Sequence, residues 1–162
     1  MKRVVVIGIG NIILGDEGVG VHILNKLRQE KIPEQVELIE GGVGGIALLN
    51  LIKGAELALF IDALAGTKPG NVHRFTRDDL EGKIKTMLHP MSLHDIGLAE
   101  MIKIGNTLYP DEMPKEIVIY GVEITKLQTY STKLSKKISA TVNKVVKLIV
   151  DELRSKSIQA SD

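Results

Sequence analysis

The chain has 162 residues, which suits one domain that buries roughly 68–70% of the surface its unfolded chain exposes. It contains no cysteine, which excludes disulfides, a cysteine nucleophile and thiolate metal ligands. The net charge of +1 and the aromatic content of 3% lack the basic excess and the stacking residues of nucleic-acid-binding proteins. No apolar run reaches the length of about 20 residues that a membrane span needs. We therefore expect a cytoplasmic protein that binds no nucleic acid and is not inserted in a membrane.

Buried strands and amphipathic helices alternate along the chain. Short apolar runs between turn residues predict strands at 4–8, 36–40, 57–62, 71–76 and 117–122. Apolar residues at helical spacing predict helices at about 17–30, 46–53, 92–108 and 132–153. The stretch 77–91 shows the weakest pattern. Such alternation favours a parallel sheet with helices on both faces.

These elements predict a single three-layer α/β domain over residues 1–154, followed by a frayed polar tail at 155–162. The strand at 57–62 is nearly all apolar and is therefore expected at the centre of a mostly parallel, twisted sheet. The segment 71–76 alternates between apolar and polar residues, which is typical of an edge strand, and we expect it to be antiparallel.

The loop after the first predicted strand combines two conflicting signals. Gly8 and Gly10 begin a dinucleotide-binding fingerprint, in which a helix N-terminus holds a pyrophosphate. The third glycine position is instead Ile13, and Asp16 and Glu17 stand where the phosphates would lie. Two negative charges repel a phosphate and attract a cation. Acidic residues in a first helical turn also complement the helix dipole, so the pair alone favours a structural role.

Three residues are expected to converge at one edge of the sheet. Glu17 follows the first strand, Asp62 ends the third, and His94 lies at or just before the start of a helix. The carboxyl ends of parallel strands share one edge, where ligands bind. Two carboxylates and an imidazole suit a first-row transition metal with positions open to water or substrate. Alternatively, Asp62 caps the next turn, and Ser92 or His94 is the N-cap of the helix.

The remaining histidines and the familiar catalytic motifs add no second site. His22 in the first helix and His73 on the polar face of the edge strand are interpreted as structural or solvent-facing, and His89 as a loop residue of unknown role. The sequence has no Gly-x-Ser-x-Gly elbow, no His-Glu-x-x-His helix and no phosphate-binding loop with a Gly-Lys-Ser/Thr end.

At these residues the chain resembles the hydrogenase maturation endopeptidases, which trim the C-terminal extension of nickel–iron hydrogenase large-subunit precursors after nickel insertion. The glycine loop through Gly15-Asp16-Glu17 resembles the opening signature of that family, Asp62-Ala63 its second acidic motif, and 92–98 its histidine motif. The resemblance implies that Glu17, Asp62 and His94 are both the ligands of the nickel carried by the substrate and the catalytic residues of a metal-dependent endopeptidase.

The resemblance also has departures and a second tier of residues. Asp95 stands where members often have an amide, and Glu123-Ile124 where many have Gln-Pro, which bears on the substrate subtype. Asp16 and Glu40 are second-tier candidates for recognising the substrate or its metal. The alternative for Glu40 is an acidic strand end that faces water.

Two other functions stay open beside the peptidase. One is a dinucleotide-binding oxidoreductase in which Gly8, Gly10 and Glu40 play the fingerprint roles, although the acidic pair predicts that NAD does not bind. The other is a non-catalytic nickel-delivery protein with the same three ligands. The last helix has an outer face of lysines that predicts a solvated surface, and a monomer is favoured. These are Lys133, Lys136, Lys137, Lys144 and Lys147.

Overall fold

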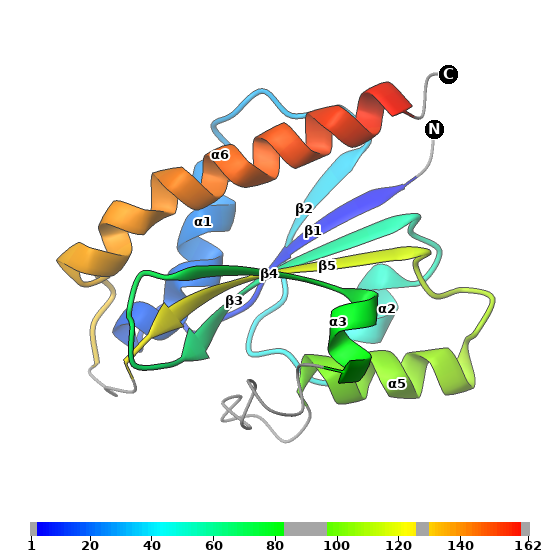
Figure 1. The fold of residues 1–162 in the computed structure, drawn as a ribbon, viewed down its shortest axis with the longest axis horizontal. Coiled ribbons are helices and arrows are strands. Elements are labelled where there is room, and N and C mark those ends of the chain that lie inside the picture. The colour runs from blue at the N-terminus through cyan, green and yellow to red at the C-terminus, as the bar shows by residue number, and fades with distance from the viewer. Residues whose placement is uncertain (1–2, 83–96, 126–129, 160–162) are drawn as a thin grey trace.

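The computed structural model describes residues 3–82, 97–125 and 130–159 (Figure 1). Within these ranges one sheet is formed by β1 (Val4–Gly8), β2 (Val36–Glu40), β3 (Leu57–Ala65), β4 (Val72–Thr76) and β5 (Glu116–Ile124). Its helical segments are η1 (Gly15–Gly18, a 3-10 turn), α1 (Val19–Leu27), α2 (Leu48–Ile52), α3 (Arg77–Gly82), α5 (Leu98–Leu108) and α6 (Lys136–Gln159).

The strand order is β2-β1-β3-β5-β4. β1 pairs in parallel with β2 and β3, and β3 pairs in parallel with β5. β4 is antiparallel to β5 at the edge. In Figure 1, α1 and α6 lie on one side of the sheet, and α2, α3 and α5 lie on the other. The predicted three-layer α/β domain with one antiparallel edge strand is therefore confirmed.

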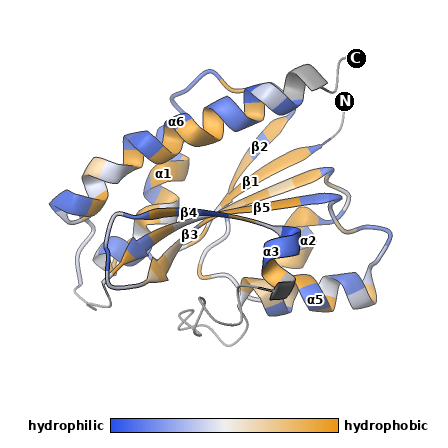
Figure 2. Cartoon of the chain, in the orientation of Figure 1, coloured by the Kyte–Doolittle hydropathy of each residue, from blue (hydrophilic) through white to orange (hydrophobic). Residues whose placement is uncertain are grey.

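The core consists of two apolar layers, one on each face of the sheet. Successive side chains of a strand point to opposite faces, so the apolar run of β3 serves both layers. Leu59 and Ile61 pack on the side of α1 and α6, whereas Ala58 and Phe60 pack on the side of α2 and α5. Figure 2 shows β1, β3 and β5 apolar along most of their length, which fits their place inside the sheet, with β3 at the centre.

The connections reverse direction between β1 and β3. From β1 the chain passes through α1 to β2, and then through α2, on the opposite face, across β1 to β3 (Figure 1). In open α/β sheets the crevice outside the carboxyl ends of the strands at such a switch point is where ligands bind. We call the edge at which β1, β2, β3 and β5 end the carboxyl edge.

Several element boundaries differ from those predicted. β3 and β5 continue to Ala65 and Ile124 because they pair with each other over nine residues each, so Asp62 lies inside β3 rather than at its end. The first predicted helix begins with the 3-10 turn η1, which contains Glu17, and α1 ends at Leu27. α3 forms in the stretch that showed the weakest pattern.

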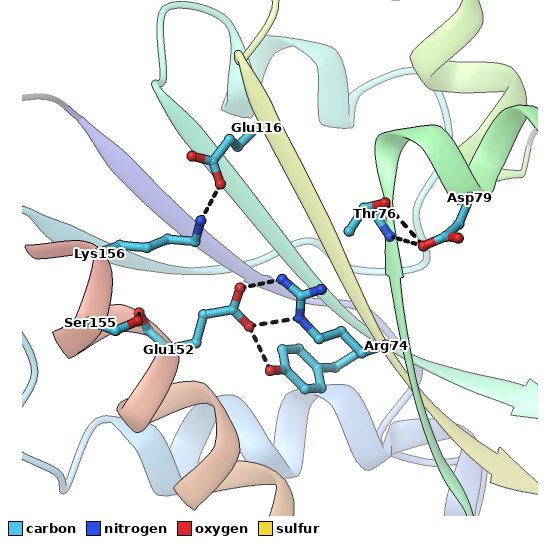
Figure 3. Close-up of polar contacts among 8 residues, drawn as sticks. Arg74, Thr76, Asp79, Glu116, Glu152, Ser155 and Lys156 are labelled. Atoms are coloured by element: carbon cyan, nitrogen blue, oxygen red, sulfur yellow. Dashed lines mark hydrogen bonds and ion pairs between the residues drawn. The ribbon is translucent and has the colours of Figure 1, made fainter. Parts of the chain in front are cut away.

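The last helix is longer than its apolar pattern predicts. α6 ends at Gln159, so residues 155–159 are helical rather than a frayed tail. Ser155 Oγ donates to the Glu152 carbonyl, and Lys156 forms an ion pair with Glu116 at the start of β5 (Figure 3). These polar contacts extend the helix beyond its last buried apolar residue, Leu153. None of the helices in the described ranges is long and apolar enough to cross a membrane.

A partly buried ion pair joins α6 to the far edge of the sheet (Figure 3). The Glu152 carboxylate accepts hydrogen bonds from Arg74 Nε (3.0 Å) and Nη2 (2.6 Å) and from the Tyr120 hydroxyl (2.6 Å). Burial raises the pKa of Glu152, but the hydrogen bonds and the charge of Arg74 outweigh burial and hold this pKa below its ordinary value. The carboxylate in turn raises the pKa of Arg74. Glu152 therefore connects α6 to β4 through Arg74 and to β5 through Tyr120.

We expect Glu152→Gln to lower the free energy of unfolding at neutral pH by about 1–2 kcal/mol, because it removes the charge that Arg74 and Tyr120 share. A depressed carboxyl pKa gives stability that is present above the unfolded pKa and is lost as the pH falls through the folded pKa. The difference from wild type, measured by urea unfolding, should therefore stay constant from about pH 7 to about pH 5 and shrink as the pH falls to about 3. The exposed neighbour Asp151 provides the control, Asp151→Asn, which should leave stability unchanged.

Candidate functional site at the carboxyl edge

Asp62 lies where β1 leaves β3. β1 pairs with β3 as far as Gly8, opposite Ile61, and the Ile9 N–H then donates to the Ile61 carbonyl at 2.8 Å. From Asp62 onward β3 pairs only with β5, beginning with Gly121. The edge of β3 on the side of β1 is therefore unpaired at Asp62, and the loop that follows β1 can approach it there.

Two glycines return that loop to the strands. Gly10 has φ +146°, and a Cβ atom there would lie 2.2 Å from the Glu17 carbonyl oxygen. A Cβ on Gly20 would lie 2.3 Å from the carbonyl oxygens of both Ile9 and Ile61. Only glycine permits such close approaches. The loop can therefore pack tightly, and η1 lies against the end of the β1–β3 pair. Gly10, which belongs to the pattern that resembles a dinucleotide fingerprint, and Gly20 therefore serve to pack η1 and its Glu17 against the strand ends.

Glu17 and Asp62 interact electrostatically. Burial raises the pKa of Asp62 to about 7, a hydrogen bond from the Ala63 N–H (2.8 Å) opposes this rise, and repulsion by Glu17 adds to it. Both side chains remain partly exposed. Two like charges at a partly buried site cost free energy in the isolated protein, and a cation bound between them would relieve that cost. The arrangement thus suits a positive ligand and disfavours a phosphate.

Asp16, the neighbour of Glu17, has a structural partner. Its Oδ1 accepts a hydrogen bond from the Ser135 N–H at 2.7 Å, at the start of α6. Beside it, the Gly15 N–H donates to the Ser131 carbonyl (2.7 Å), and the Ser131 N–H donates to the Ile13 carbonyl (2.9 Å). These contacts hold η1 against the segment before α6. The predicted recognition role of Asp16 stays a prediction, and the structure adds this role in fixing η1.

Glu40 also has a partner, at the end of β2. Its Oε1 accepts from Arg28 Nη1 at 3.0 Å, and both side chains are about half exposed. The pair joins the C-terminal end of α1 to the carboxyl edge. Surface pairs of this kind are worth about 0–1 kcal/mol, so the contact neither requires nor prevents a role for Glu40 in binding. Its second-tier recognition role stays a prediction.

His94, the third predicted ligand, lies outside the described residues, as do His89 and Ser92. Over residues 3–82, 97–125 and 130–159, no group of three or more His, Cys, Asp or Glu side chains is arranged to hold a metal ion. The structure therefore brings together two of the three predicted ligands. α5, which His94 precedes in the chain, begins at Leu98 on the sheet face that Asp62 shares.

One polar pair at the carboxyl edge was not predicted. His73 Nε2 lies 3.1 Å from Glu123 Oε2, and its ring stacks on Phe75. The Lys68 N–H donates to Glu123, and the hydrogen bonds from Lys68 and His73 together lower the pKa of this carboxyl. Glu123 therefore holds the turn between β3 and β4. The pair confirms the interpretation of His73 as structural. The face on which His73 lies is not the polar one that was predicted, because His73 shares it with the buried Phe75.

The register explains this pair and relates it to Asp62. His73 lies opposite Gly121, which in turn lies opposite Asp62, so all three occupy one row across β4, β5 and β3. Residues in one row share a face. The sequence does indicate that His73 and Phe75, two residues apart in a strand, share a face. Only the pairing of β4 with β5 identifies Glu123 as the partner of His73.

Fold and site together define a class: a single-domain α/β protein whose switch point presents carboxylates rather than a phosphate cradle. Comparison with known proteins then identifies the family. The family model for the hydrogenase maturation proteases matches residues 21–152. The chain belongs to this family and is accordingly a peptidase by class, as its sequence motifs predicted.

Individual relatives agree with this assignment. The chain is 27% identical over 161 residues to the hydrogenase 2 maturation protease of Escherichia coli, covering 98% of this chain and 94% of the relative. It is 32% identical over 136 residues to the hydrogenase expression/formation protein HupD of Bradyrhizobium diazoefficiens, covering 83% and 69%. The solved structure of the hydrogenase maturating endopeptidase HybD from E. coli has a TM-score of 0.79 at 27% identity, covering 95% and 93%.

We expect Asp62→Asn to stabilise the metal-free protein at alkaline pH. A raised carboxyl pKa means that stability is fully present below the unfolded pKa and is lost as the pH rises through about 7. Asparagine carries no charge and keeps an oxygen for the Ala63 N–H. The gain should be about 1–3 kcal/mol near pH 8 and much smaller near pH 4, measured by urea unfolding with a chelator. An equal gain at both pH values would contradict the assigned cause.

Proposed function

We propose that this protein is the endopeptidase that removes the C-terminal extension of a nickel–iron hydrogenase large-subunit precursor after nickel has been inserted. Glu17, Asp62 and His94 bind the nickel that the precursor carries. The observation that supports the proposal is the repulsive pair of carboxylates, Glu17 and Asp62, at the switch point of a maturation-protease fold. A phosphate or a nucleotide would be repelled by this pair of carboxylates.

The donor chemistry suits nickel. Carboxylate oxygens and an imidazole nitrogen are acceptable ligands for divalent first-row metals, and nickel lies high in their order of affinity. A precursor without nickel meets two carboxylates with no counter-charge. A precursor with nickel brings a positive charge that both carboxylates neutralise, at a site where burial strengthens the interaction. Nickel in the substrate thus acts as the recognition element, and it explains how a peptidase distinguishes loaded from empty precursor.

Docking by the nickel would place one peptide bond of the precursor at the carboxyl edge. Hydrolysis adds water across that C–N bond, which leaves a carboxylate on the large subunit and an amine on the released extension. Either the nickel of the substrate or a carboxylate of the site activates the attacking water. Docking through the nickel would hold that bond aligned with the site.

The test is a cleavage assay with a C-terminally extended large-subunit precursor, with and without nickel, read out by intact mass. Wild type should release the extension only from the nickel-loaded precursor. Glu17→Gln and His94→Ala should each reduce the rate by about 100-fold or more, because each removes a ligand that positions the scissile bond. Circular dichroism should stay unchanged for both variants.

A matched control is Glu34→Gln, which neutralises an exposed glutamate before β2, at the opposite edge of the sheet. This variant should cleave at the wild-type rate. Normal processing by the Glu17 and His94 variants would refute the site assignment. Tight nickel binding by the isolated protein without any cleavage would instead favour a nickel-delivery protein.

The absence of dinucleotide binding remains a prediction of the same charge argument. Titration of the protein into NADH should produce no change in nicotinamide fluorescence, because Asp16 and Glu17 repel the pyrophosphate at the start of α1. Saturable binding that competes with the precursor would favour the oxidoreductase alternative.

A further inference from the structure

Large apolar side chains are exposed together at the carboxyl edge. Seven such side chains are exposed in the described part of the chain, and five of them lie in segments that border the Glu17–Asp62 site. We call these five the apolar rim: Ile12 (47% exposed), Ile13 (51%), Val43 (43%), Ile46 (45%) and Tyr130 (88%). Exposed apolar residues scattered singly are ordinary, whereas a cluster around a site marks a surface that contacts a partner.

The rim comes from three segments far apart in sequence, and backbone hydrogen bonds join them. The Gly10 N–H donates to the Gly42 carbonyl at 2.9 Å, which joins the loop after β1 to the loop after β2. The Ser131 N–H donates to the Ile13 carbonyl at 2.9 Å, which joins Tyr130 and its neighbours to the same loop. The rim is therefore held in place before any partner arrives, which reduces the entropy lost on binding.

Both acidic side chains beside the rim already have partners within the chain. Asp16 accepts the Ser135 N–H, and Glu40 pairs with Arg28. The carboxylates of the central pair, Glu17 and Asp62, thus lie inside a border in which exposed apolar side chains predominate. A small metal complex or a nucleotide would not need such a border, whereas a folded protein substrate has to be held around the bond that is cut.

We infer that the apolar rim is the docking surface for the large-subunit precursor, and that it contacts an apolar patch on the precursor beside its nickel site. This inference rests on the proposed function and extends it. The partner is assigned as the substrate because the rim is continuous with the site at which its peptide bond must lie. The rim supplies affinity, and the two carboxylates supply the selection for nickel.

The test is the steady-state kinetics of Ile13→Ser and Val43→Ser on the nickel-loaded precursor. Each variant should raise KM about tenfold, which corresponds to the loss of one well-buried aliphatic side chain at an interface. The kcat should stay within about twofold, since binding is lost equally from the ground state and the transition state. Thermal unfolding should be unchanged because both side chains are exposed.

The control is Leu108→Ser. Leu108 is 61% exposed at the end of α5, and the following chain enters β5 at the opposite edge of the sheet. It loses the same kind of side chain, and its KM should equal that of wild type. If the rim variants and this control share one KM while wild type cleaves the precursor, the docking surface is refuted and the proposed function stands. If wild type cleaves no nickel-loaded precursor, both fail.

A second copy of the chain is the other occupant that the rim could accept. Sedimentation velocity separates the two cases. Wild type and Ile13→Ser should sediment alike as the same species. A wild-type dimer that dissociates in Ile13→Ser, with KM unchanged, would overturn the inference and assign the rim to self-association.

Discussion

The point at which β1 parts from β3 controls the chemistry of this molecule. Pairing stops at Gly8 opposite Ile61, and the next residue of β3 is Asp62. The loop after β1 then has room to fold back and bring Glu17 near that carboxylate. A second carboxylate in a partly buried place is unfavourable for the isolated protein, and such unfavourable groups persist where function requires them. The end of the β1–β3 pairing, at the point where the connections reverse direction, is thus what allows the site to present two negative charges.

Close-packed glycines after the first strand are typical of nucleotide sites in other α/β proteins, but they have a different consequence here. At Gly10 and Gly20 the close neighbours are backbone atoms of the chain itself, namely the carbonyl oxygens of Glu17, Ile9 and Ile61. In both kinds of protein the glycines allow the first helix to pack tightly against the strands. The side chains at the start of that helix then decide which charge of ligand is favoured. Acidic side chains there make the helix start unfavourable for an anion.

The sequence predicted the layers, the central place of β3 and the meeting of Glu17 with Asp62, because these follow from apolar periodicity and from parallel topology. It did not predict the partners of Asp16, Glu40 and His73. Those partners, Ser135, Arg28 and Glu123, are distant in sequence, and only register and loop geometry bring them into contact. The sequence pattern did not predict the extension of α6 to Gln159 for a similar reason, since polar contacts stabilise this extension rather than a buried apolar stripe.

In the proposed function, selection and affinity have separate physical origins at the carboxyl edge. The carboxylate pair would discriminate by charge, so its contribution would change sign between a substrate that carries a metal and one that does not. The apolar rim contributes in proportion to the area it buries and is indifferent to the metal. A protease that relied on the rim alone would bind empty and loaded precursors equally. One that relied on the carboxylates alone would bind free metal ions as readily as its substrate. The loops of the rim are hydrogen-bonded to each other, and the N–H of Gly15 in η1, which contains Glu17, donates to the Ser131 carbonyl. Correct docking would therefore require the carboxylates and the rim together.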